Sequence, residues 1–399
     1  MEANMHRRHF IAASLSTIAL PSLATAQASG FQNWIAAFRG RARAAGINDR
    51  TFNAAFADIQ YLPDSIERDR NQAEFVRPLA DYMSTAVSDT RVSNGRDMVR
   101  RYAGLLAQIE ARFDVEPQVV VAVWGMESNY GQRRGDTPLI STLATLAYDG
   151  RRGQFFESQL IAALKILQNG DVAPRNMTGS WAGAMGHTQF IPTSYEAYAV
   201  DFTGDGRRDI WTDDPSDALA STAAYFRRFG WRKGQPWGVE VRLPRAFDFG
   251  QTGRTVTRRP SEWARLGVVG VDGRAVPDYG DATLSTPTGA GGPAFLLFRN
   301  YDVIGRYNNA EAYIIGVGHL SDRIRGAGPL QTAFPADERR LRRAERRELQ
   351  QRLTNRGFST QGVDGRIGPN SRAAIRAYQR SVGLPPDGHP SMGLLQRLR

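Results

Sequence analysis

The residue best suited to acid–base chemistry is Glu127, which ends a helix predicted over residues 117–129. Val120, Val123 and Trp124 precede it by seven, four and three residues, so all four share one helix face. Burial on an apolar face raises the pKa of a carboxyl group, and the negative end of the helix dipole acts in the same direction. A carboxyl group that keeps its proton near neutral pH can protonate the leaving oxygen of a glycosidic bond. A glutamate that simply reaches solvent at a helix end is the alternative that this segment leaves open.

The elements that must position Glu127 are predicted to be mostly helical. Apolar residues recur at helical spacing in residues 30–113, 156–169, 217–229 and 311–325. Residues 238–298 are instead rich in Gly, Pro and alternating β-formers, which indicates a small β-rich insertion. The fold class is therefore predicted to be mainly α (α+β).

The N-terminus, residues 1–28, is predicted to be a signal peptide. Basic residues precede an apolar run at 11–23 that is too short to span a bilayer, and residues 24–28 offer small-x-small cleavage sites. The order Arg-Arg-x-Phe at residues 7–10 is similar to a twin-arginine signal, and a buried N-terminal helix is the alternative. Without cysteine the chain cannot be a lipoprotein of the cysteine-linked kind, and no second apolar segment is long enough for a transmembrane anchor. We expect a periplasmic protein.

The composition narrows the class of partner. The 399 residues suggest two or three folding units, and the formal charge of +11 favours a polyanion such as nucleic acid, an anionic membrane or an acidic cell wall. The export signal and the lack of an aromatic–basic motif argue against nucleic acid. The absence of cysteine excludes disulfides and thiolate metal sites.

Several motifs in order resemble one enzyme family. Glu-Ser-Asn-Tyr-Gly at residues 127–131 and the segment 180–195 are similar to two motifs of the lytic transglycosylases, a lysozyme-like superfamily. The segments 198–217 and 299–308 resemble its B-type branch in particular. The resemblance covers residues 30–325, and it implies a catalytic domain with a lysozyme-like core over that range.

The resemblance also implies roles for individual residues. Glu127 corresponds to the catalytic acid/base, and seven further residues correspond to positions that bind substrate. These are Arg151, Arg152, Ser180, Gln189, Tyr225, Asn300 and Tyr307. For each of the seven, a purely structural hydrogen bond is the competing account. One departure is that His187-Thr188 replaces the Tyr-Gly more common in the family, which bears on local geometry or subsite preference.

The implied reaction cleaves the β-1,4 bond between N-acetylmuramic acid (MurNAc) and N-acetylglucosamine (GlcNAc) in peptidoglycan. The muramyl 6-hydroxyl acts as nucleophile, so the product is a 1,6-anhydromuramyl end and no cofactor is required. A hydrolytic muramidase is one alternative, and it would need a positioned water and a second carboxylate. A non-catalytic peptidoglycan-binding scaffold is another.

A loop beginning at residue 201 has the spacing of a cation site. Oxygen-bearing residues alternate and glycine is sixth, as at the start of an EF-hand loop, but no glutamate is twelfth. The predicted ligands of a structural Ca²⁺ are Asp201, Thr203, Asp205, the carbonyl of Arg207 and, by resemblance, Asp217. Asp213 and Asp214 are rival closing ligands, and a plain Asp-Gly turn without metal is the alternative.

The end of the chain is predicted to be a separate unit. Residues 326–337 contain two prolines and two glycines and are expected to be a linker. Residues 338–399 resemble the small three-helix peptidoglycan-binding domain of many wall enzymes, which would raise the local concentration of the catalytic domain at the wall. The expected partners are peptidoglycan glycan strands, with other cell-wall enzymes as further candidates, and the protein is expected to be a monomer.

Overall fold

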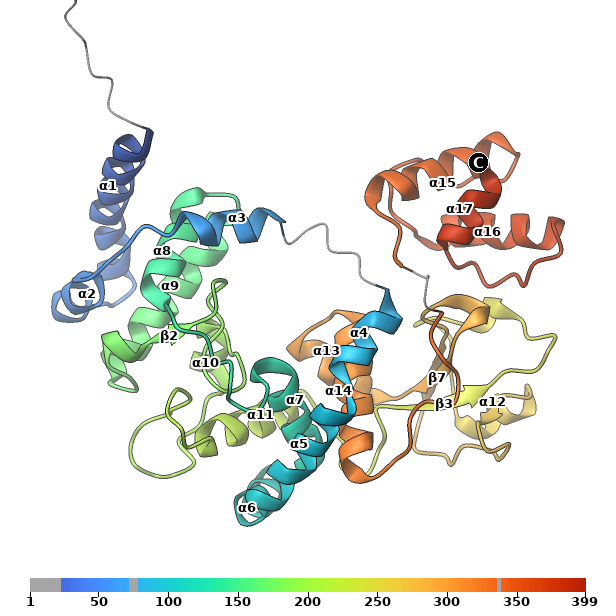
Figure 1. Ribbon diagram of the computed structural model, residues 1–399, viewed down its shortest axis with the longest axis horizontal. Helices are drawn as coiled ribbons and strands as arrows, with labels where there is room; N and C mark the ends of the chain where they lie inside the picture. Colours follow the sequence, from blue (N-terminus) through green and yellow to red (C-terminus); the bar gives the residue numbers. More distant parts are fainter. Residues whose placement is uncertain (1–22, 72–77, 336–338) are drawn as a thin grey trace, which may run out of the picture.

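The computed structural model describes residues 23–71, 78–335 and 339–399. Most of the predicted signal peptide lies outside these ranges, and residues 23–28 form the start of the first helix. Within the described part of the chain, no helix is long and apolar enough to cross a membrane. Helices dominate the chain, as the sequence predicts (Figure 1).

Six helices make up the N-terminal part. They are α1 (Leu23–Ala44), α2 (Asp49–Phe56), α3 (Pro63–Asn71), α4 (Leu79–Ala86), α5 (Asp89–Arg101) and α6 (Ala103–Phe113). In Figure 1 the first three lie with α8 (Leu139–Asp149) and α9 (Gly153–Asn169), whereas α4 and α5 lie beside α7 (Pro117–Ser128) and α14 (Glu311–Arg325). The first three helices therefore pack on α8 and α9, whereas α4, α5 and α6 pack on α7 or α14, the helices around Glu127.

Helix α7 is the central element of that core. Pro117 occupies its first turn, where a missing N–H costs nothing, and residues 119–125 are all buried. The helix ends because Asn129 adopts a left-handed conformation, with φ of 51°. A Cβ at Gly125 would lie only 2.6 Å from the ring of Tyr130, so only glycine lets the chain turn back so closely.

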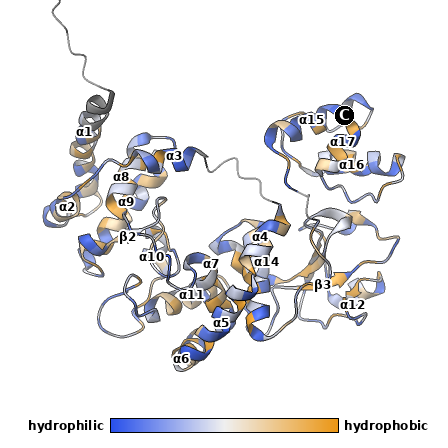
Figure 2. Ribbon diagram, in the orientation of Figure 1, coloured by the Kyte–Doolittle hydropathy of each residue, from blue (hydrophilic) through white to orange (hydrophobic). Residues whose placement is uncertain are grey.

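Four further helices complete the main body. They are α10 (Pro192–Tyr198), α11 (Ser216–Arg228), α12 (Pro260–Arg265) and α13 (Arg299–Tyr307), and a two-stranded sheet joins β1 (Thr137–Pro138) to β2 (Thr178–Gly179). Helices α5, α6, α11 and α14 contact α7 directly. Hydrophobic and hydrophilic residues alternate around the helices, as expected for amphipathic elements that share a core (Figure 2).

A five-stranded antiparallel sheet interrupts the helices between α11 and α13. Its strands are β3 (Gly238–Arg242), β4 (Thr257–Arg258), β5 (Val269–Gly270), β6 (Ala282–Ser285) and β7 (Ala294–Leu297), in the order β4-β6-β7-β3-β5. Strand β7 is buried on both faces, and Val239 of β3 pairs with its Leu296. Trp263 of α12 is fully buried and fills a second hydrophobic core under this sheet.

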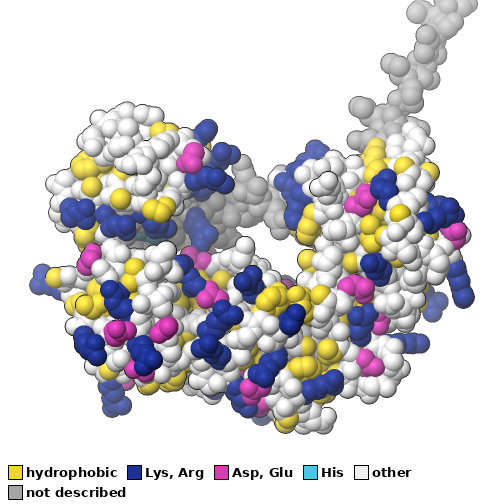
Figure 3. Space-filling view, turned by 180° about the vertical axis from the view of Figure 1, so that it is seen from behind, with side chains coloured by type: hydrophobic (Ala, Val, Ile, Leu, Met, Phe, Trp, Pro, Cys, Tyr) yellow, Lys and Arg dark blue, Asp and Glu magenta, His cyan; other side chains and the backbone are white. Residues whose placement is uncertain are grey.

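Three helices close the chain around a core of their own. They are α15 (Arg343–Asn355), α16 (Pro369–Ser381) and α17 (Met392–Leu398), with Leu349, Ile375 and Leu395 fully buried between them. The segment before them is bonded to the sheet, because the Glu240 carboxylate of β3 accepts the amides of Gln331 and Thr332 at 2.8 and 2.7 Å. Figure 3 shows Lys and Arg side chains around the hollow between these helices and the rest of the molecule.

Candidate active site

Glu127 lies half-buried in the last turn of α7 and faces α14. The hydroxyl of Tyr313 on α14 donates a hydrogen bond to Glu127 Oε1 at 2.5 Å. Burial raises the pKa of Glu127 to about 7, and the bond from Tyr313, which favours the ionised form, lowers it in part. The carboxyl group is therefore poised to lose and regain a proton near neutral pH.

Tyrosine side chains from three helices surround this carboxyl group. Burial raises the pKa of Tyr82 on α4 to about 12, and the charge of Glu127 adds to that rise. The same two causes hold the pKa values of Tyr307 and Tyr313 well above the usual range. All three hydroxyls therefore keep their protons at neutral pH, so they can donate hydrogen bonds without adding negative charge beside Glu127.

The second motif forms a tight loop beside α7. Ser180 Oγ accepts the amide of Ala184 at 3.1 Å, and Gln189 Nε2 donates to the carbonyls of Arg134 and Gly186, both at 2.9 Å. Gln189 also has a left-handed backbone, with φ of 53°. Ser180 and Gln189 therefore shape the loop through backbone contacts, and both stay partly exposed.

His187 joins this loop to the catalytic helix. The indole Nε1 of Trp124 donates to His187 Nδ1 at 3.1 Å, and Ser128 Oγ donates to the His187 carbonyl at 2.5 Å. His187 Nε2 lies 2.7 Å from the carbonyl of Thr212, so the ring also contacts the segment ahead of α11. Burial lowers the pKa of His187. His187 is one of the two residues at which the sequence departs from the lytic transglycosylase motif. It links α7, the second-motif loop and the segment ahead of α11.

Tyr225 and Tyr307 lie together on one side of the site. The Tyr307 hydroxyl donates to the Thr188 carbonyl, which places α13 against the second-motif loop. The buried Tyr225 packs edge-on against Tyr307, with ring centroids 5.2 Å apart, and donates to the Arg306 carbonyl at 2.6 Å. Tyr307 lies close enough to Glu127 to sense its charge, and Tyr225 packs against the ring of Tyr307.

Asn300 does not line a cleft, contrary to the expectation from the sequence. Its side chain is fully buried and bonds only to backbone groups, accepting from Arg232 N and donating to the carbonyls of Arg232 and Gln235. Each polar atom of its amide is occupied. The physical role of Asn300 is therefore to fix the turn after α11 against α13.

The arginine pair lies between α8 and α9 and makes other contacts. Arg151 forms an ion pair with Asp69 of α3, with Nε 2.7 Å from Oδ2. The Arg152 guanidinium lies 4.3 Å from the centre of the Phe155 ring. Both arginines therefore lie where α3, α8 and α9 meet. The ion pair of Arg151 holds α3 against α8 and α9.

The predicted calcium ligands are not assembled around one point. Among the described residues, no three Asp, Glu or His side chains form a group that could hold a metal ion. Asp217 is buried in the first turn of α11, and its carboxylate accepts the amides of Phe202, Thr203 and Asp209 at 2.8, 3.1 and 2.8 Å. In this metal-free conformation Asp217 therefore holds the loop through its amides, and its role as a calcium ligand stays a prediction.

The other candidate ligands are also engaged. Asp201 accepts the amides of Gly204 and Gly206 at 2.6 and 2.9 Å, as in the metal-free turn that the sequence left open. Asp205 accepts the amide of Arg207 at 2.9 Å. The rival closing residues face elsewhere, since Asp213 pairs with Arg134 and Asp214 accepts from Ser216.

Sequence reasoning missed Tyr313 and Tyr82. Tyr313 lies 186 residues from Glu127 along the chain, and nothing in its local pattern distinguishes it from a core aromatic residue on a helix. The available signal was the predicted helix over 311–325, whose packing partner the sequence alone does not specify.

Comparison with known proteins agrees with this arrangement. The mainly helical, lysozyme-like fold and the protonatable carboxyl group of Glu127 fit a glycan-cleaving class of enzyme. The chain belongs to the transglycosylase SLT domain family, which it matches over residues 30–322. Residues 342–398 match the putative peptidoglycan binding domain.

Three relatives illustrate the range of similarity. SltB3 from Pseudomonas aeruginosa, solved with NAG-anhNAM-pentapeptide, is 49% identical with a TM-score of 0.87, covering 92% of this chain and 99% of that one. Membrane-bound lytic murein transglycosylase B of Escherichia coli is 31% identical over 250 residues, which are 61% of this chain and 66% of the relative. Slt35 of Escherichia coli, solved with calcium, is 27% identical with a TM-score of 0.62, covering 74% of this chain and 92% of that one.

Proposed function

We propose that this enzyme cleaves the β-1,4 bond between MurNAc and GlcNAc in peptidoglycan and leaves 1,6-anhydromuramyl ends, with Glu127 acting first as acid and then as base. The observation that carries the proposal is a half-buried carboxyl group whose pKa is raised to about 7 and whose Oε1 accepts a bond from Tyr313. Near neutral pH, a carboxyl group with that pKa can both donate and accept a proton at a small cost in free energy.

In the first step Glu127 supplies the proton. Because Oε1 accepts from Tyr313, the proton is assigned to Oε2. It passes to the bridging oxygen while the bond from that oxygen to the muramyl C1 breaks, and GlcNAc leaves with a new hydroxyl. Positive charge develops at C1, where the neighbouring acetamido group can assist.

In the second step the ionised Glu127 takes a proton back. The muramyl 6-hydroxyl attacks C1, its oxygen bonds to C1, and its proton returns to Glu127. The nucleophile belongs to the same sugar, so the step is intramolecular and gains from proximity. No water is consumed, and the bond from Tyr313 stabilises the ionised carboxylate between the two steps.

The surroundings of Glu127 favour this route over hydrolysis. A hydrolytic enzyme normally uses a second carboxylate to activate water or to form a glycosyl intermediate. In the described part of the chain, the titratable groups coupled to Glu127 are the hydroxyls of Tyr82, Tyr307 and Tyr313, and no second carboxyl group contributes to its pKa. The substrate is therefore expected to provide its own nucleophile.

The proposal extends to place and partner. Residues 1–28 are expected to direct export to the periplasm, and the three C-terminal helices are expected to hold peptidoglycan near the catalytic core. The chemistry as written needs no cofactor. A calcium ion in the loop that starts at Asp201 would act on stability alone, because it would replace no catalytic group.

Digestion of purified sacculi tests the function. Wild-type protein should release muropeptides one water lighter than those of a muramidase, because the anhydro bond replaces a reducing end, and mass spectrometry separates the two products. Glu127→Gln should release either product about 10²- to 10⁴-fold more slowly while keeping the wild-type circular dichroism spectrum. Reducing ends from the wild type would assign the hydrolytic reaction instead.

A further inference from the structure

His187 contacts the chain both before and after Glu127. Its Nδ1 accepts from the indole of Trp124 at 3.1 Å, and its carbonyl accepts from Ser128 Oγ at 2.5 Å. Its ring also lies against Gly131, where a Cβ would come within 2.6 Å of the imidazole. Trp124 and Ser128 belong to the last turn of α7, so these contacts fix the turn that carries Glu127.

The partners of the His187 ring permit only its neutral form. The Trp124 indole can only donate, so Nδ1 carries no proton and the single proton of the neutral ring lies on Nε2. Nε2 then donates to the Thr212 carbonyl at 2.7 Å, an acceptor that it shares with Arg134 Nη1. A second ring proton would face the indole N–H and would place a cation 3.2 Å from the Arg134 guanidinium. The bond to Trp124 therefore requires the neutral ring.

The charged groups that face the His187 ring come from the segments after α7 and ahead of α11. Burial lowers the pKa of His187 most, and the Arg134 guanidinium lowers it further. The Thr212 carbonyl and the carboxylates of Asp213 and Asp209 raise the pKa, but the net shift is downward from 6.5. The ring is therefore neutral at pH 7 and becomes half protonated only at a pH below 6.5.

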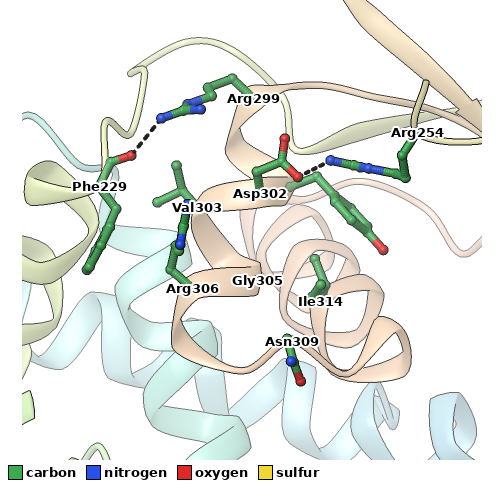
Figure 4. Close-up of a pocket in the computed structure, with 10 residues that line it drawn as sticks. Phe229, Arg254, Arg299, Asp302, Val303, Gly305, Arg306, Asn309 and Ile314 are labelled. Atoms are coloured by element: carbon green, nitrogen blue, oxygen red, sulfur yellow. Dashed lines mark hydrogen bonds and ion pairs between the residues drawn. The ribbon is translucent and has the colours of Figure 1, made fainter. Parts of the chain in front are cut away.

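The second-motif loop that carries His187 is also anchored to α13. The Tyr307 hydroxyl donates to the carbonyl of Thr188, the next residue of the loop. Figure 4 shows how α13 is attached in turn, since Arg299 at its start donates to the Phe229 carbonyl at the end of α11, at 3.2 Å. These bonds do not involve the imidazole. Protonation of the ring therefore releases the end of α7 and leaves the loop on α13.

We propose that His187 is a positioning residue for Glu127 and acts only in its neutral form, an inference that rests on the proposed function. Burial and the bond from Tyr313 set the pKa of Glu127, so His187 acts on the direction of the carboxyl group and not on its charge. The proposed reaction needs no ionised acid in the free enzyme, because Glu127 enters it with its proton. Glu127 alone therefore gives kcat/KM an alkaline limb, and His187 adds an acid limb.

The pH dependence of kcat/KM for soluble glycan strands tests this role in two variants, with all released muropeptides counted. His187→Asn places an amide oxygen near the position of Nδ1, so it can accept from Trp124 but cannot titrate. Arg134 still donates to the Thr212 carbonyl in this variant. His187→Asn should keep most of the wild-type kcat at pH 7 and lose the acid limb, while the alkaline limb near pH 7 stays in place.

The second variant, His187→Phe, keeps a ring but removes the acceptor. It should lower kcat about ten- to a hundredfold with KM little changed, because the carboxyl group is misdirected while the substrate still binds. His319→Asn is the matched control, since His319 on α14 is also buried and its pKa is lowered to about 4. A wild-type profile without an acid limb, or an acid limb that persists in His187→Asn or disappears in His319→Asn, would overturn the inference.

NMR separates this inference from the proposed function. In the Glu127→Gln protein, which has no titrating carboxyl group at the site, the indole N–H of Trp124 is followed as the pH is lowered from 7.5 to 4.5. Its signal, assigned by its loss in Trp124→Phe, should shift through the pH of the acid limb. The shift should be absent in Glu127→Gln/His187→Asn, whatever product the wild type makes. An indole signal that does not move in the Glu127→Gln protein would also overturn the inference.

Discussion

The bond from Tyr313 to Glu127 gives a prediction with a defined sign. Tyr313→Phe removes the hydroxyl and leaves the ring, so the burial that raises the pKa of Glu127 remains while the bond that lowers it is lost. A hydrogen bond to a charged group contributes about 1.5–3 kcal/mol, and one pKa unit corresponds to about 1.4 kcal/mol. The pKa of Glu127 should therefore rise from about 7 by roughly one to two units.

This shift has a visible consequence for activity. The first step needs protonated Glu127, so kcat/KM of the wild type should fall as pH rises through about 7. At pH 8 roughly one tenth of the wild-type groups would hold the proton, against roughly half or more in the variant. The alkaline limb of the variant should therefore move to higher pH, while its maximal kcat falls because the ionised carboxylate loses a donor.

The assay is release of anhydromuropeptides from soluble glycan strands between pH 5 and 9, quantified by mass spectrometry. Tyr279→Phe, at an exposed tyrosine in the β-rich insertion, is the matched control and should keep the wild-type profile. An alkaline limb that stays in place in Tyr313→Phe, with activity still measurable, would refute the reasoning. Either Glu127 would not be the acid, or Tyr313 would not control its pKa.

Three further predictions concern Glu127 and the loop before α11. Glu127→Gln should lower the rate of anhydromuropeptide release about 10²- to 10⁴-fold, and a smaller loss would assign the proton transfer to another group. Because the folded pKa of Glu127 is raised from 4.5 to about 7, stability falls as pH rises from 4.5 to 7, by roughly 3 kcal/mol in total. Glu127→Gln should therefore melt higher than wild type at pH 8 but not at pH 4.5, and equal gains at both values would contradict the linkage. Asp217→Asn should lower the free energy of unfolding by about 1–3 kcal/mol in the presence of a chelator, because an amide replaces a buried carboxylate that accepts three N–H bonds. The loss should appear as a lower melting temperature, and an unchanged melting temperature would count against that role.

The local elements were predictable from the sequence because their boundaries depend on local chemistry. The helix expected over 117–129 runs over Pro117–Ser128, and the one expected over 217–229 runs over Ser216–Arg228. Proline starts the first helix, and a left-handed Asn129 ends it. The apolar face that ends at Glu127 was also visible, and its effect on the pKa follows from burial alone.

The directions of individual side chains were not predictable in the same way. A resemblance marks a position, but whether Asn300 faces a cleft or a turn depends on where α13 packs, and it faces the turn. The spacing of the loop was consistent with calcium, yet Asp217 faces loop amides because α11 carries it inward. The bond from Tyr313 joins distant segments, so only the assembled fold reveals it.

The two amide bonds that Glu240 accepts from residues 331 and 332 matter beyond the sheet. A free connector would let the last three helices sample many separations from the active centre, and the point of cutting would be averaged over all of them. Bonds at β3 instead fix the connector at residues 331 and 332, ahead of the last three helices. If the last domain binds the wall, the fold then sets the distance between the bound part of the wall and the bond that is cleaved. The lengths of the released fragments would reflect that distance.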